Sequence, residues 1–128
     1  MKTKRQIKNF ILKTLLPYKQ NKDLCGFSSE GYCVYLNDNG QKCAVGRWLK
    51  KGKWQTEETD VETLFRRHDS DAILLKPAYD MGFTVSQWGS MQRYHDEIAS
   101  SSSKNIINFA VNILERKFNI ELNELRIS

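Results

Sequence analysis

The chain has 128 residues, of which 40% are hydrophobic and 27% are charged. This length suits a single domain, and the composition is that of a globular protein rather than a disordered one. The formal net charge of +5 comes from 20 basic and 15 acidic residues, and a positive excess suits an anionic partner. No apolar run approaches the roughly 20 residues that a membrane-spanning helix needs, so we expect no membrane association.

The first segment predicts a helix over residues 4–16. Pro17 is expected to end this helix, because its ring removes an amide donor and disfavours helical geometry in the preceding residue. The first 22 residues contain seven basic side chains and no acidic one, which makes the helix basic. The apolar residues with the spacing of one helix face are Ile7, Phe10, Ile11 and Leu15.

Residues 32–48 predict an antiparallel β-hairpin. β-Forming residues precede the turn signal Asn37-Asp38-Asn39-Gly40, whose glycine can take a positive φ. A tighter turn on Asn39-Gly40 would shift the register, so the register stays open. With the bulged turn, the side chains on one face are Cys33, Tyr35, Cys43 and Val45.

The later part of the chain, residues 56–120, predicts helices. One helix covers residues 57–68 with Thr56 as its N-cap, and the next begins at the N-cap Ser86 and ends near Ala99. The apolar stripe of this second helix is formed by Trp88, Met91, His95 and Ile98.

The final predicted helix covers residues 104–118 and is apolar around most of its circumference. This pattern predicts the central, buried helix of the fold. Together, the elements predict an α+β fold in which one hairpin packs on three to five helices. Residues 1–128 are expected to form one compact domain.

Metal and cofactor chemistry is not favoured by the cysteine spacing. A zinc site would draw on Cys25, Cys33, Cys43 and either His68 or His95, but the cysteines lie eight and ten positions apart. Structural zinc sites bring their ligands in close pairs, so we predict no metal and no cofactor. An odd number of cysteines without a secretion signal indicates free thiols in a reducing compartment.

Cysteine catalysis is the enzymatic alternative, with Cys43 as the nucleophile and His95 as its base. Asp96 directly follows His95, and adjacent helix residues point in different directions, so we do not expect Asp96 to orient the imidazole. The competing interpretation is that Cys33, Cys43 and His95 are buried packing residues. The sequence favours this second interpretation and a protein without enzymatic activity.

A second basic cluster surrounds two tryptophans. Lysines attract an anion, and indole rings stack on bases or fill an apolar pocket of a protein partner. The alternative is that these lysines only keep the protein soluble. The partner is expected to be an anionic ligand or a protein, with nucleic acid possible, and the oligomeric state is left open. The candidate binding residues are Arg47, Trp48, Lys50, Lys51, Lys53 and Trp54.

Two motifs resemble those of a family of small phage and prophage proteins without an assigned reaction. Residues 33–35 and 40–46 resemble its C-x-Y and G-x-K-C-A-V-G signature, and residues 91–96 resemble its L-Q-x-x-H-D motif, with Met91 in place of leucine. The resemblance covers about residues 30–99. The motif residues are Cys33, Tyr35, Cys43, Gly46, Gln92, His95 and Asp96.

The resemblance implies a phage-type accessory protein in the cytoplasm of a bacterial host cell. Small phage proteins of this kind act by binding, so the expected function is to bind a nucleotide, a nucleic acid or a host protein and to counter host defence. A DNA-binding regulator that uses the N-terminal helix is a further alternative.

Overall fold

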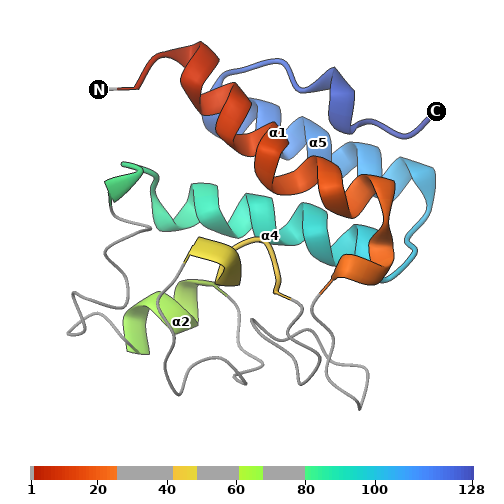
Figure 1. The fold of residues 1–128 in the computed structure, drawn as a ribbon, viewed down its shortest axis with the longest axis horizontal. Helices are drawn as coiled ribbons and strands as arrows, with labels where there is room; N and C mark the ends of the chain where they lie inside the picture. Colours follow the sequence, from red (N-terminus) through yellow and green to blue (C-terminus); the bar gives the residue numbers. More distant parts are fainter. Residues whose placement is uncertain (1, 26–41, 49–60, 68–79) are drawn as a thin grey trace.

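The computed structural model describes residues 2–25, 42–48, 61–67 and 80–128. Of these residues 73% are helical. Figure 1 shows α4 across the middle of the molecule, with α1 and α5 on one side of it and α2 on the other. The α-helices are α1 (Lys4–Gln20), α2 (Val61–Arg67), α4 (Val85–Ala99) and α5 (Lys104–Phe118), and the short 3-10 helices are Lys22–Leu24, Gly46–Trp48 and Asn123–Leu125.

This helical architecture corrects the predicted α+β fold. The described residues contain no sheet, and residues 42–48, expected to include the second hairpin strand, form a turn and a 3-10 helix. The Arg47 N–H donates to Cys43 O at 3.2 Å, and the Trp48 N–H donates to Val45 O at 3.0 Å. Backbone groups that a hairpin would pair across strands are therefore paired within the turn. Residues 32–36 lie outside the described residues.

The prediction that Pro17 ends the first helix is wrong, because α1 continues to Gln20. A proline inside a helix removes the hydrogen bond that its amide would make to the residue four positions earlier. Tertiary contacts compensate for this loss, since Tyr18 in the last turn is only 3% exposed. Its hydroxyl also donates to Lys42 O at 2.6 Å, which fixes the last turn to a distant segment.

Two α-helices begin with reciprocal capping contacts. In α4, the Gln87 N–H donates to Thr84 Oγ1 at 3.0 Å and the Thr84 N–H donates to Gln87 Oε1 at 2.8 Å. Thr3 and Gln6 form the same pair at the start of α1. Ser86, the predicted N-cap of α4, instead lies inside its first turn, because the threonine-glutamine pair satisfies two amides where the serine would satisfy one.

The central helix is α4, whereas the sequence pattern predicted α5. The predicted bounds of α5 are confirmed, but Ile106 and Phe109 on its outer side are 46% and 49% exposed. Apolar composition does not reveal how many neighbours a helix has, and α4 alone contacts α1, α2 and α5. The predicted stripe of α4 is confirmed, and its buried members are Trp88, Met91, His95 and Ile98.

An aromatic cluster joins α1, α4 and α5. The ring of Trp88 lies 5.4 Å from that of Phe83 and 6.0 Å from that of Phe10, and Phe83 lies 4.9 Å from Phe118. The rings meet at tilted or edge-to-face angles, which are the favourable arrangements for aromatic pairs. Phe10 also packs against Trp48 at 4.7 Å, so the cluster anchors the turn at residues 42–48 to α1.

Candidate functional site

A buried polar cluster forms where residues 42–48 pack against α4. At its centre, Gln92 is 8% exposed, and its Oε1 accepts a hydrogen bond from the Val45 N–H at 3.2 Å. Gln92 Nε2 donates to Asp96 Oδ1 at 2.8 Å, one helical turn further along α4. Two motif segments that the sequence singled out, residues 40–46 and 91–96, therefore meet through Gln92.

His95 extends this cluster and is fully buried. Its Nδ1 lies 2.8 Å from Asp96 Oδ1 and 3.3 Å from Gln92 Nε2. Because an ionised carboxylate can only accept, we assign the proton of this hydrogen bond to Nδ1, which donates to Asp96 Oδ1. The expectation that Asp96 cannot orient this imidazole is wrong. Nδ1 is the ring nitrogen nearer the backbone, so the short carboxylate of the adjacent residue reaches it.

The other ring nitrogen of His95, Nε2, has no hydrogen-bond partner within the described part of the chain. Tyr18 closes this side of the cluster, because its ring meets the imidazole edge-to-face at 4.7 Å and 88°. Tyr18 comes from the turn of α1 that the sequence did not predict to be helical. The cluster thus joins α1, α4 and residues 42–48.

Two buried thiols adjoin the cluster. Cys25 is 3% exposed and Cys43 is fully buried. Burial, with a further contribution from Asp96, raises the pKa of the Cys25 thiol to about 12. A thiol with a raised pKa is a poor nucleophile at neutral pH, which argues against Cys25 as a nucleophile. Cys43, the nucleophile of the enzymatic alternative, is part of the buried core. Cys33 and Tyr35 lie outside the described residues.

Alkaline pH is expected to lower the free energy of unfolding. Burial raises the pKa values of Tyr18 and Tyr94 above their usual range, and that of Cys25 from 9.0 to about 12. Each group keeps its proton in the folded state, so its stabilisation is complete below the ordinary pKa and is lost as pH rises towards the folded value. Urea unfolding above about pH 9 should show this decrease.

Tyrosinate absorbance provides the direct readout of the buried hydroxyls. At about pH 11, we expect at least two of the five tyrosines to remain protonated in the folded protein and to ionise on adding denaturant. Tyr94→Phe should remove one of these two delayed ionisations, because the Tyr94 hydroxyl is buried and donates to Leu125 O at 2.8 Å. Normal titration of all the tyrosines in the folded protein would contradict the assignment.

Two predicted binding residues, Arg47 and Trp48, are built into the fold. Arg47 Nη1 donates to Thr14 O at 2.8 Å, and its guanidinium lies 6.0 Å from the ring centre of Tyr18. Trp48 is half-buried against Phe10. These contacts make both side chains structural. The other predicted binding residues lie outside the described part and are Lys50, Lys51, Lys53 and Trp54.

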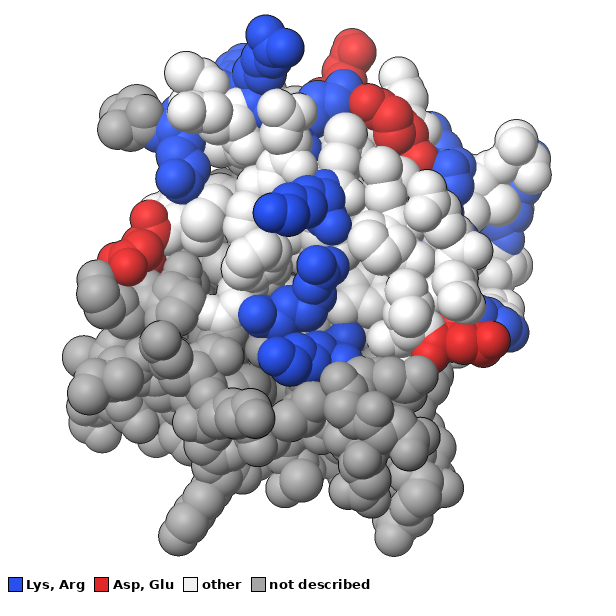
Figure 2. Space-filling view, viewed as in Figure 1, with Lys and Arg blue, Asp and Glu red and all other residues white. Residues whose placement is uncertain are grey.

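The basic residues of the N-terminal region fall into two sets. Lys8 Nζ lies 3.1 Å from Glu124 Oε2, and Lys19 Nζ donates to Glu124 O at 2.7 Å, so these two lysines hold the C-terminal segment. Figure 2 shows Lys and Arg side chains gathered in a column on one face of the molecule. Lys22 Nζ donates instead to Ser101 Oγ. The remaining basic residues of this region are exposed and form no ion pair in the described part of the chain: Lys2, Lys4, Arg5 and Lys13.

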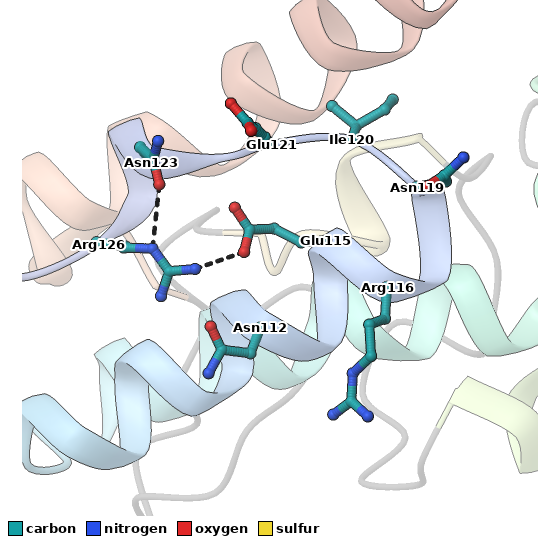
Figure 3. Close-up of a pocket in the computed structure, with 8 residues that line it drawn as sticks. All are labelled: Asn112, Glu115, Arg116, Asn119, Ile120, Glu121, Asn123 and Arg126. Carbon is teal, nitrogen blue, oxygen red and sulfur yellow. Dashed lines mark hydrogen bonds and ion pairs between the residues drawn. The ribbon is translucent and has the colours of Figure 1, made fainter.

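A hollow of about 790 Å³ lies beside the C-terminal end of α5 (Figure 3). Two of its charged groups are engaged with each other, because Arg126 pairs with Glu115 and also donates to Asn123 Oδ1 at 3.3 Å. Glu115 Oε2 accepts from the Leu122 N–H at 2.8 Å. These contacts fix the C-terminal segment to α5, so the hollow is structural. Its lining residues are Asn112, Glu115, Arg116, Asn119, Ile120, Glu121, Asn123 and Arg126.

Comparisons with protein-family models, curated proteins and solved structures each give no match. None of the helices in the described part has the length and apolar character needed to cross a membrane. Within residues 2–25, 42–48, 61–67 and 80–128, no group of three or more His, Cys, Asp or Glu side chains is arranged to hold a metal ion.

Proposed function

We propose that this chain is a phage-type binding protein without enzymatic activity, which takes an anionic partner on the exposed basic side of α1. The observation that carries the proposal is that four cations of the N-terminal region, which has no acidic residue before Asp23, are exposed and form no ion pair in the described part of the chain. Binding an anion there breaks no existing ion pair. The motif resemblance supports a role against host defence, and the basic cluster at residues 50–54 is tested separately.

The position of these cations on α1 strengthens the argument. Lys4 and Arg5 lie in the first turn, where α1 has no acidic residue. The helix dipole places partial positive charge there, so basic side chains in that turn cost roughly 0.3 to 1 kcal/mol each. An anionic partner would relieve this repulsion. Ile11 and Leu15 are fully buried, so the helix presents its cations from a rigid support.

Reversing three of these charges is expected to weaken binding by at least tenfold. The variant Lys4→Glu/Arg5→Glu/Lys13→Glu should fold normally, since all three side chains are exposed. Fluorescence anisotropy with a labelled single-stranded oligonucleotide at low salt measures the effect. A charge-matched control variant reverses three exposed residues of α5 and should retain most of the affinity: Lys104→Glu/Arg116→Glu/Lys117→Glu.

The chemical class of the partner follows from two further measurements. Extended nucleic acid should dissociate steeply as salt rises, whereas a nucleotide or a protein interface should respond less. Mass spectrometry of molecules that co-purify from phage-infected cells identifies the ligand.

The variant Lys50→Glu/Lys51→Glu/Lys53→Glu tests the second basic cluster, at residues 50–54. Equal binding by the wild type and both N-terminal and second-cluster variants would contradict the proposal.

A further inference from the structure

The outer side of α5 carries a row of apolar side chains. Ile106 and Phe109 are about half exposed, and they are two of the three large hydrophobic side chains that the described residues leave exposed. They lie one helical turn apart and share one face, and half-buried Ile113 continues the row one turn further. Contiguous exposed apolar side chains of this kind mark an interaction surface.

Two charged side chains of α4 border this row. The exposed guanidinium of Arg93 lies 5.6 Å from the ring centre of Phe109, and Glu97 follows Arg93 by one helical turn. Helix α5 returns antiparallel to α4 after residues 100–103 (Figure 1). Because Arg93 lies over Phe109, this antiparallel course places Glu97, one turn later on α4, beside the preceding turn of α5, which contains Ile106. Neither Arg93 nor Glu97 forms an ion pair within the described part of the chain.

We propose that a second copy of this chain covers this surface in a symmetric dimer. A two-fold axis brings the same patch of both copies together. Arg93 of each copy would then face Glu97 of the other copy, which gives two equivalent ion pairs. The apolar rows of the two α5 helices would pack against each other beside these pairs. A patch with one cation and one anion a helical turn apart, neither in an ion pair with another described residue, is complementary to itself. A strongly acidic partner would instead place like charge against Glu97.

The dimer would be of modest affinity. Helices of 15 residues are about 22 Å long, so two of them offer a face near the lower limit of specific interfaces, about 1,200 Å² in total. We therefore expect dissociation in the micromolar range. Sedimentation velocity of the full chain over a range of concentrations should show a monomer–dimer equilibrium.

Charge reversal tests the pairing directly. Arg93→Glu and Glu97→Arg should each be monomeric, because each places like charges across the axis. An equimolar mixture of these two variants should recover the dimer, since both cross-axis pairs are then opposite in charge. Phe109→Ser should weaken the dimer at least tenfold. Leu24→Ser is the matched control, because Leu24 is 44% exposed elsewhere and its loss should leave the dimer unchanged.

Recovery by mixing separates loss of the interface from loss of the fold, because two unfolded variants cannot restore each other. A wild type that stays monomeric at all concentrations would overturn the proposal. So would single reversals that dimerise as well as the wild type, or a wild-type monomer that binds an acidic protein through Phe109. If the charge-reversal variant of α1 bound an anion as well as the wild type, the proposed binding surface on α1 would be contradicted. The dimer would not be, because the two surfaces are tested separately.

Discussion

Replacing Trp88 with alanine is expected to lower the free energy of unfolding by about 3 to 5 kcal/mol. Trp88 is fully buried in α4, and its ring contacts those of Phe10 and Phe83. Its removal therefore leaves a cavity between α4 and its neighbours, which the surrounding helices can close only in part. Urea unfolding followed by circular dichroism measures the loss, and a change under about 1 kcal/mol would contradict the packing described.

Trp88→Phe is the informative comparison. The indole Nε1 is buried and has no hydrogen-bond partner within the described residues. An unpaired buried donor costs about 1 to 3 kcal/mol, so phenylalanine removes a penalty while leaving only a small cavity. We expect Trp88→Phe to cost much less than Trp88→Ala. Equal costs for the two variants would contradict both the unpaired indole N–H and the packing of the ring described here.

The ends of a helix were predictable where apolar residues recur along one face of that helix. In α4, Trp88, Met91, His95 and Ile98 recur with helical spacing and are all buried. The bounds of α5 were also predicted, since Ser103 caps its first turn and the apolar pattern stops at Phe118. The exposure of the outer side of α5 was not predictable in this way, because it depends on which helices surround α5.

The turn at residues 42–48 could not be predicted from local preference. Cys43 to Val45 suit a strand, yet the Val45 N–H is satisfied by Gln92, which lies 47 positions later. A contact between residues so far apart leaves no pattern in the local sequence. The helical position of Tyr18 could be read from the local sequence, because Tyr18 continues the buried face of Ile11 and Leu15 at helical spacing. Because Pro17 was expected to end the helix, Tyr18 was not included in it, and its contact with His95 in the polar cluster was missed.

Gln92→Ala is expected to lower the free energy of unfolding by about 2 to 3 kcal/mol and to loosen residues 42–48. The substitution leaves the Val45 N–H without its acceptor and takes a donor from Asp96. Burial prevents water from replacing the bond to Val45 freely, since Val45 is fully buried and Gln92 is 8% exposed, whereas the Asp96 carboxylate is partly exposed and can accept from water instead. Amide hydrogen exchange should show faster exchange at Val45 than in the wild type. Unchanged protection there would contradict the assigned bond.

Two further variants separate the two hydrogen bonds of Gln92. Gln92→Glu keeps an acceptor for the Val45 N–H but sets a second carboxylate beside Asp96, so it should destabilise the fold while largely preserving protection at Val45. Adding Asp96→Asn should recover much of the loss, because the asparagine amide can donate to the new carboxylate and its oxygen can still accept from His95 Nδ1. Gln87→Ala is the matched control on α4: it removes the cap of that helix and the hydrogen bond from Gln87 Nε2 to Lys117 O, neither of which involves residues 42–48. It should cost about 1 to 2 kcal/mol and leave exchange at Val45 unchanged. A double variant no more stable than Gln92→Glu alone would show that Asp96 is not the acceptor that holds Gln92 in place.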